Sequence, residues 1–395
     1  MVKCYQSVFM KKNIIKNLGF FISVIILFFF FICFILFYSK YYKDLKKQIF
    51  MIVGAIKNID LMNTHKNKLS LNKKESKLNE NKNNDKIIFK KISINKSEKL
   101  KNKNKDNKNE FINDLNINKN INSPPIKSKY SIKNVNSKIK KNISEKKIYN
   151  KGLYKEYKKL LEYNDNEKNE LSYEEAIKFD RRTFFQYYYS LMKIKNIFLF
   201  AFFPNNDYNS RIIKIFLFFF SFFTQLTINA LYFTDDTMHK IYIDQGRFDF
   251  IYQIPQIVFS SLISYVIDSL ISYLSLSEND IIKIKEVKKE NKENENIDNL
   301  IEINVVKKLK IKFAFFFLFS LIIILVFGFY VSCFCGVYKN TQIHLITDTS
   351  ISFGLSLISP FIFGVFPAIF RIASLRDKAK KRKLMYKFSN LIEIF

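Results

Sequence analysis

Five long apolar stretches constrain the fold of this chain more than any other feature of its sequence. They cover residues 18–38, 212–233, 250–276, 313–335 and 349–370. A helix needs about 20 apolar residues to cross a hydrocarbon core roughly 30 Å thick, and backbone groups in lipid must pair within their own segment. Helices buried in a soluble protein are the alternative, but several stretches are apolar on nearly every side and lack a polar face. The pattern therefore predicts an all-α integral membrane protein with about five transmembrane helices.

Lysine and arginine beside the spans predict the orientation, because cytoplasmic loops carry the excess of these residues. The loop between the third and fourth spans and the tail at residues 371–395 are dense in them. The loops at 234–249 and 336–348 carry few. We therefore expect residues 171–395 to form a polytopic membrane domain whose C-terminus is cytosolic.

The side of the N-terminal anchor, residues 1–56, stays open because lysines flank its span at 18–38 on both sides. It depends on whether residues 183–203 also cross the membrane. Lys193 and Lys195 interrupt this aromatic stretch, and Pro204 ends it. The pattern favours a helix lying in the interface, which would place the N-terminus outside.

Residues 57–170 are dominated by lysine and asparagine and contribute to a net charge of +30 over 395 residues. Such a segment cannot bury enough apolar surface to offset the entropy of ordering, so we predict a disordered linker. Anionic lipid headgroups are the partners that its charge favours. Nucleic acid is not expected, because aromatics for base stacking are almost absent from it. The Lys, Asn and Phe bias with no Trp is typical of AT-rich coding sequence.

The third span contains an ionisable residue on a polar face. Ser260, Ser264, Asp268 and Ser272 recur every four residues and so share one side of a helix. An acid at this depth costs about 3 kcal/mol on insertion scales, so it should face protein or water. It either lines an ion or proton pathway or joins helices through hydrogen bonds. In the second case the candidate partners lie on the second span: Thr224, Gln225, Thr227 and Asn229.

Glycine and proline interrupt the fifth span at Gly354, Pro360, Gly364 and Pro367. Proline removes a backbone hydrogen bond and kinks a helix. Broken helices are where transporters bind substrates, although a kinked packing helix is the alternative. The candidate pathway residues are accordingly Asp268, Ser264, Ser272, Pro360 and Gly364.

Neither a catalytic motif nor a firm metal site is present in the sequence. It has no glycine-rich phosphate loop, nucleophile elbow or HExxH pair, so an enzyme and a cofactor are not expected. Carboxylates and imidazoles at the outer rim could meet around a divalent cation, but their number is low. They are Asp235, Asp236, His239, His344 and Asp348.

Several blocks of the C-terminal half occur in a recognisable order: KFDRRTFFQYYYSLMK at 178–193, DDTMHKIY at 235–242, FYVSCFCGVYKNTQ at 329–342 and SFGLSLISPFIFGVFPAIFR at 352–371. Together with DYNS at 207–210, they resemble the C-terminal membrane region of uncharacterised multi-pass membrane proteins of ciliates and apicomplexan parasites. The resemblance covers residues 171–395 and implies a shared membrane architecture and a protist source. It implies no activity and no functional residues.

Three functions remain open from the sequence. The first is a non-enzymatic membrane protein that assembles with itself or with other membrane proteins. The second is an ion channel or transporter that uses Asp268 and the broken fifth span. The third is a membrane-anchored adaptor that displays its basic linker.

Overall fold

A computed structural model describes residues 14–59, 62–63, 152–244, 249–290, 295–376 and 382–394. All secondary structure in these residues is helical, as predicted. The chain divides into two compact units, residues 55–161 and the remainder. Most of the smaller unit, including the predicted disordered linker from 64 to 151, lies outside the described residues. The larger unit contains all five apolar stretches of the sequence.

Five helices in the described part are long and apolar enough to cross a membrane, which confirms the helical class and the predicted number of long apolar helices. The first is α3 (Leu18–Leu36), which continues through a π-helical turn at Phe37–Tyr41 to the end of the long helix at Ile59. The others are α10 (Arg211–Tyr232), α12 (Phe250–Ser275), α14 (Glu295–Val337) and α15 (Gln342–Phe363), the last extended by α16 (Val365–Leu375).

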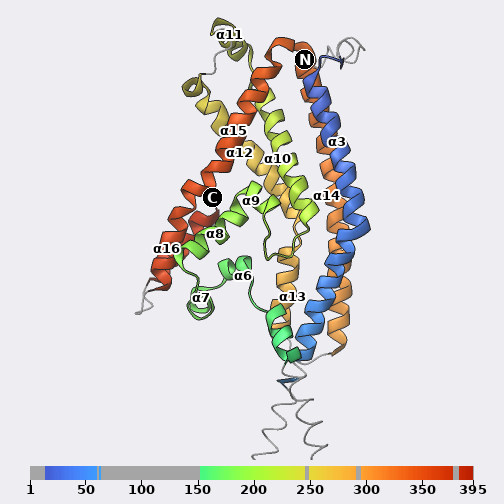
Figure 1. Ribbon diagram of the computed structural model, residues 1–395, viewed down its shortest axis with the longest axis vertical. Helices are drawn as coiled ribbons and strands as arrows, with labels where there is room; N and C mark the ends of the chain where they lie inside the picture. The colour runs from blue at the N-terminus through green and yellow to red at the C-terminus, as the bar shows by residue number, and fades with distance from the viewer. Residues whose placement is uncertain are drawn as a thin grey trace, which may run out of the picture. The chain divides into compact units, whose positions relative to one another are not determined.

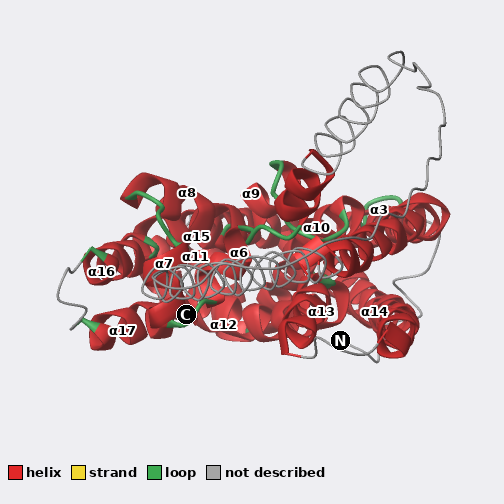
Figure 2. Cartoon of the chain, turned by 90° about the horizontal axis from the view of Figure 1, so that it is seen from below, coloured by secondary structure: helices red, strands yellow, loops and turns green. Residues whose placement is uncertain are grey.

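Helix α10 lies at the centre of the bundle and contacts α3, α9, α12, α14 and α15 (Figure 1). Its buried residues include phenylalanines along much of its length and a polar set in its C-terminal half. Seen from below, α3 and α14 lie at one side of the bundle and α16 at the other (Figure 2). Helix α10 therefore contributes many of the side chains buried at the centre of the bundle.

Helices α3 and α14 pack closely because small residues face each other. A Cβ on Gly19 would lie 2.7 Å from both the Cys335 Sγ atom and the Val331 carbonyl oxygen. One turn further along, a Cβ on Gly328 would lie 3.0 Å from the Ser23 Cβ atom. Small residues of this kind allow membrane helices to approach each other.

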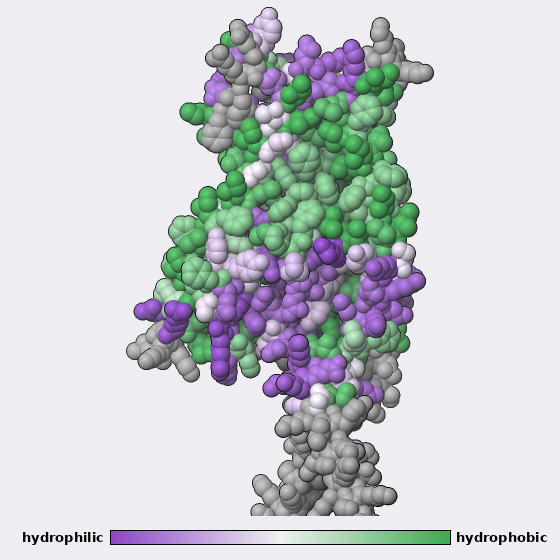
Figure 3. Space-filling view, in the orientation of Figure 1, coloured by the Kyte–Doolittle hydropathy of each residue, from purple (hydrophilic) through white to green (hydrophobic). Residues whose placement is uncertain are grey.

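An apolar band separates two hydrophilic zones on the surface (Figure 3). The 22 residues of α10 extend for about 33 Å, close to the thickness of a hydrocarbon core. Helix α11 (Asp235–Ile243) lies at one end of this band and α13 (Glu278–Glu290) at the other. The start of α3 lies at the α11 end, where the Leu18 amide donates to the Gln342 Oε1 atom at 2.8 Å.

Residues 183–203 form two short helices rather than the single interfacial helix expected. They are α8 (Phe184–Lys195) and α9 (Ile197–Phe202), and neither is among the candidate spans. Asn196 separates them: its Oδ1 atom accepts from the Leu199 amide and so caps α9, while its Nδ2 atom donates to the Leu357 carbonyl. An asparagine that competes with the backbone in this way favours a helix boundary.

The predicted linker ends earlier than residue 170. Asn164 caps α6 (Asp165–Glu170), and the buried Glu167 forms an ion pair with Lys285 at 2.8 Å. These polar residues fold because they have partners elsewhere in the chain, which composition does not show. They are followed by α7 (Tyr173–Phe179).

The predicted basic tail is also partly structured. Helix α17 (Lys383–Ile394) packs against α16, and Arg371, which the sequence places at the start of the tail, is fully buried. Gly364 separates α15 from α16 and packs against the Met192 side chain.

Candidate functional site

Asp268 faces the central helix. The Ser221 hydroxyl of α10 donates to its Oδ2 atom at 2.5 Å, and its Oδ1 atom is buried with no hydrogen-bond partner in the described residues. The predicted partner helix is therefore right and the predicted partner residues are wrong. Because α10 and α12 run antiparallel, an acid near the α13 end of α12 lies level with the first half of α10, where Ser221 is.

The residues proposed as partners of Asp268 lie further along α10, and those with hydrogen bonds in the described residues bind other groups. The Gln225 Nε2 atom lies 3.3 Å from both the Ser260 and the Ser261 hydroxyls of α12. The Asn229 Nδ2 atom donates to the Thr349 and Ser352 hydroxyls of α15 at 3.2 and 3.0 Å. Helix α10 thus carries polar contacts to two different neighbours at successive depths.

A second buried acid lies at the α11 end of these contacts. Asp348 of α15 is 2 % exposed and interacts with the Gln253 amide of α12. The sequence predicts Asp348 at the outer rim with His344 and α11, but it points into the bundle instead. The described residues contain no group of three or more potential ligands that could hold a metal ion. The rim site is not formed.

These residues make a polar track through the apolar bundle, between α10, α12 and α15. From Gln253 to Asp268 it follows α12 for about 22 Å, most of a hydrocarbon core. Along it, buried side-chain oxygens lack a hydrogen-bond partner in the described residues: those of Thr224, Asn229, Gln253, Ser264, Asp268 and Asp348. Unpaired polar groups in such an environment are costly, so a group that satisfies them would bind there.

The structure does not bring the five predicted pathway residues together. Asp268 and Ser264 belong to the track. Ser272 lines a cavity of about 660 Å³ at the α13 end of α12. Pro360 and Gly364 line a second cavity of about 540 Å³, between α12 and the broken helix. The serine spacing places Ser272 on the same side of α12 as Asp268, one turn nearer to α13.

Gln253, Ser221 and Asp348 were missed as parts of the track. Each is a polar residue inside an apolar stretch or at its edge, which is a usable signal. What the sequence lacks is the relative register of α10, α12 and α15, which decides that these residues meet.

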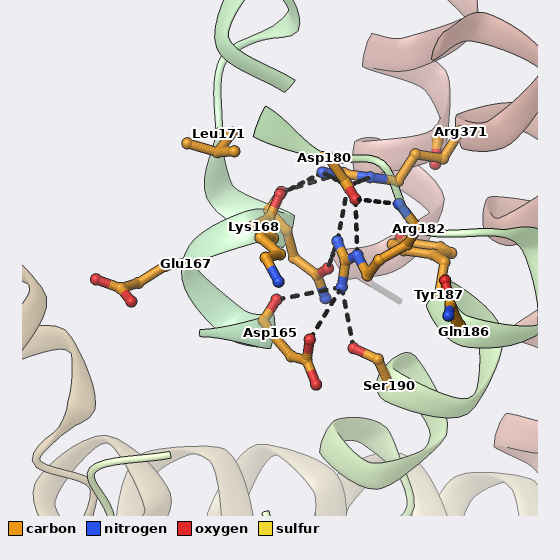
Figure 4. Close-up of polar contacts among 12 residues, drawn as sticks. Asp165, Glu167, Lys168, Leu171, Asp180, Arg182, Gln186, Tyr187, Ser190 and Arg371 are labelled. Atoms are coloured by element: carbon orange, nitrogen blue, oxygen red, sulfur yellow. Dashed lines mark hydrogen bonds and ion pairs between the residues drawn. The ribbon is translucent and has the colours of Figure 1, made fainter. Parts of the chain in front are cut away.

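A separate buried cluster joins α16 to the segment from α6 to α8 (Figure 4). The Asp180 Oδ2 atom lies 2.8 Å from the Arg182 Nη2 atom and 3.3 Å from the Arg371 Nη2 atom. The Arg371 guanidinium also lies between the rings of Tyr187 and Tyr386, 5.1 and 4.8 Å from their centroids. Burial favours the neutral acid, but the hydrogen bonds and charges of the two arginines outweigh it and lower the pKa of Asp180.

Glu278, at the start of α13, is held differently. Its carboxylate accepts hydrogen bonds from the side-chain amides of Asn164, Asn166 and Asn209 and has no cationic partner in the described residues. Burial, helped by the nearby Asp207 carboxylate, raises the pKa of Glu278 to about 7. This acid therefore titrates near neutral pH.

The apolar helices and the track define the class, a helical integral membrane protein with a polar path inside its bundle. No family model, curated protein or solved structure matches the chain. The geometry of the bundle is therefore the guide to its function.

Proposed function

We propose that the protein moves a small cation or protons across the membrane along the polar track. The supporting observation is a pair of acids near opposite ends of an otherwise hydroxyl and amide path: Asp348, which is buried, and Asp268, whose Oδ1 atom is buried without a partner in the described residues. Ionisable residues inside a membrane are costly and commonly mark ion pathways and proton relays. The track spans most of the hydrocarbon core, so a cation would cross only a short apolar stretch at either end.

The polarity of the track favours a cation. Its buried atoms without partners are carbonyl, carboxylate and hydroxyl oxygens, whereas the amide N–H groups of Gln225 and Asn229 already donate to hydroxyls. Such oxygens are the ligands of hard cations and accept protons. An anion would meet two carboxylates and few available donors.

The orientation is part of the proposal. Lysine density favours a cytosolic α13 end. The cavity lined by Ser269 and Ser272, close to Asp268, would then open on the cytosolic side. The start of α3 lies beside Gln342 at the other end of the bundle, so the N-terminus would be outside. Protease added to sealed vesicles with the cytosolic side exposed should cut between Lys283 and Lys312 and after Arg371. Protection of both sites would invert the arrangement.

The test of function is cation flux into proteoliposomes, with a pH-sensitive dye for protons and separate Na⁺ and K⁺ gradients. Asp268→Asn keeps the volume and removes the charge, so the variant should insert normally and lose flux. Ser264→Ala should weaken flux because its oxygen lies on the track. Asp235→Asn removes an exposed acid on α11, and Ile267→Ala changes an apolar neighbour; neither should alter flux.

A structural role predicts the opposite set of results. If Asp268 only joins helices, Asp268→Asn should be mild and Asp268→Leu should reduce assembly. Wild-type vesicles that carry neither protons nor metal cations across a range of gradients would remove the transport proposal. Self-assembly and an adaptor role for the linker remain predictions from the sequence.

A further inference from the structure

A groove follows α12 from the middle of the apolar band to the α13 end of the helix. Its first part is the cavity of about 540 Å³, which α12 lines between residues 257 and 265. Its second part is the cavity of about 660 Å³, which α12 lines between residues 269 and 276. Lys195 of α8 and Glu393 of α17 line both parts and mark their junction.

The first part of the groove suits a hydrocarbon chain. It is lined mainly by apolar side chains of α12 and α15, among them Leu262, Leu355 and Phe363. Leu262 and Phe363 are 57 % and 64 % exposed on helices that the apolar band places in the membrane. Lipid is the medium in contact with these faces, and the volume is typical of small-molecule sites.

The second part brings the Lys195 ammonium to the level where a lipid headgroup would lie. The Lys195 ammonium carries three N–H donors. In the described residues, its one hydrogen-bond acceptor is the Glu393 backbone carbonyl. The Glu393 carboxylate is already bound by Tyr187 and Asn169, at 3.0 and 3.1 Å. Lys195 therefore retains donors for an anion.

The other charges of this cavity are largely accounted for. Lys308 and Lys312 pair with Asp280 at 3.0 and 2.8 Å, and the Glu278 carboxylate is occupied by three amides. Burial and neighbouring carboxylates raise the pKa of Glu170, while Lys283 acts in the opposite direction. Lys283 has no ion pair in the part of the chain that the structure describes. Lys195 and Lys283 are therefore the lysines of this cavity that lack an ion pair in the described residues.

We propose that this groove binds an anionic glycerophospholipid of the leaflet on the α13 side, with an acyl chain in the apolar part and the phosphate at Lys195. The order of the two parts along α12, apolar toward the membrane centre and charged, with Lys195, toward its surface, matches the order of chain and headgroup in that leaflet. The groove adjoins the polar track at Ser261 and near Asp268, but lipid binding at Lys195 does not depend on transport.

The absence of tryptophan from the chain makes a direct test possible. Phe363→Trp places a single fluorophore in the groove, and Phe319→Trp places one on α14 at a position 46 % exposed outside it. Each variant is reconstituted in vesicles that contain brominated phosphatidylglycerol or brominated phosphatidylcholine. Bromine quenches tryptophan on contact, so the quenching curves give the relative occupancy of the two lipids at each position.

We expect the tryptophan at 363 to prefer the anionic lipid and the one at 319 to show little preference. Lys195→Gln in the Phe363→Trp background should reduce the preference about five-fold, the factor that one lysine contributes near an anionic surface. Lys193→Gln is the matched control, since Lys193 donates to the Pro204 carbonyl and does not line the groove. Equal preference at positions 363 and 319, or no effect of Lys195→Gln, would overturn the proposal. Recovery of fluorescence on adding inorganic phosphate would assign the site to a soluble anion instead.

Discussion

Removing the Asp180 carboxylate should release the contact between α16 and the segment from α6 to α8. Asp180 is the shared partner of two arginines: Arg182 donates to its Oδ1 atom through Nε and to its Oδ2 atom through Nη2, both at 2.8 Å, and Arg371 donates to Oδ2 at 3.3 Å. The side chains of Asp180 and Arg371 are fully buried. Asp180→Ala would leave the Arg371 guanidinium without an ion pair in the described residues and Arg182 with only the Asp165 carboxylate, 3.8 Å away.

The loss of stability on Asp180→Ala depends on the contacts that the two arginines keep. Breaking a buried ion pair by removing one partner costs about 3–5 kcal/mol, because the remaining charge stays buried. The Arg371 guanidinium keeps the Asn169 and Lys168 carbonyls and the two tyrosine rings, which places the expectation at the lower end, about 3 kcal/mol. At about 1.4 kcal/mol for each factor of ten, local opening should become on the order of 10²-fold more frequent.

Hydrogen–deuterium exchange of α8, α16 and α17 in detergent measures this opening. Asp165→Ala is the matched control: its carboxylate lies 3.8 Å from Arg182 and is 47 % exposed, so its removal should change exchange little. Adding Arg371→Met to Asp180→Ala should recover most of the protection, since it removes the buried guanidinium that the first substitution leaves without an ion pair. Equal exchange in Asp180→Ala and wild type, or no recovery in the double variant, would refute the assignment of the cost to buried charge.

Other predictions concern packing and pH. Gly19→Ala should destabilise the α3–α14 pair by about 1–3 kcal/mol, because its Cβ would meet the Cys335 Sγ atom at 2.7 Å. Gly354→Ala is the control: its Cβ would meet open space, so the substitution should be neutral or stabilising in thermal unfolding. The pKa of Glu278 is raised from 4.5 to about 7, so the folded protein binds this proton more tightly and stability should fall as pH rises through that window. Glu278→Gln should remove this part of the pH dependence of the thermal midpoint.

The number and place of the apolar helices could be predicted from the sequence because the bilayer imposes a length on each one. The ends of helices that continue beyond the apolar stretches could not be predicted in this way. Helix α14 begins at Glu295, well before the predicted start of the fourth span at 313, because charged residues extend the helix without interrupting its backbone hydrogen bonds. The division between α8 and α9 depends on a single capping asparagine, and a hydropathy window averages over such a residue.

The candidate site was predicted in part. Asp268 and Ser264 stood out as polar residues on one face of an apolar helix. Ser221 and Asp348 needed the register between helices, which is decided by contacts such as Asn229 with Thr349 and Ser352 and not by any local pattern. Arg371 was assigned to a solvated tail because arginines beside a span usually lie in water; its partner Asp180 is 191 residues away along the chain.

Helix α12 connects the two proposed sites through one residue. Ser261 accepts from Gln225 on the polar track and also lines the apolar part of the groove, so the faces of α12 that serve the two sites meet there. The distinguishing residues lie away from this shared point, Asp268 on the track and Lys195 at the end of the groove. Asp268→Asn should therefore leave the lipid preference intact, and Lys195→Gln should leave the track chemically unchanged. A loss of flux in Lys195→Gln vesicles would then report coupling between the lipid and the track through α12, because this substitution removes no group from the path itself.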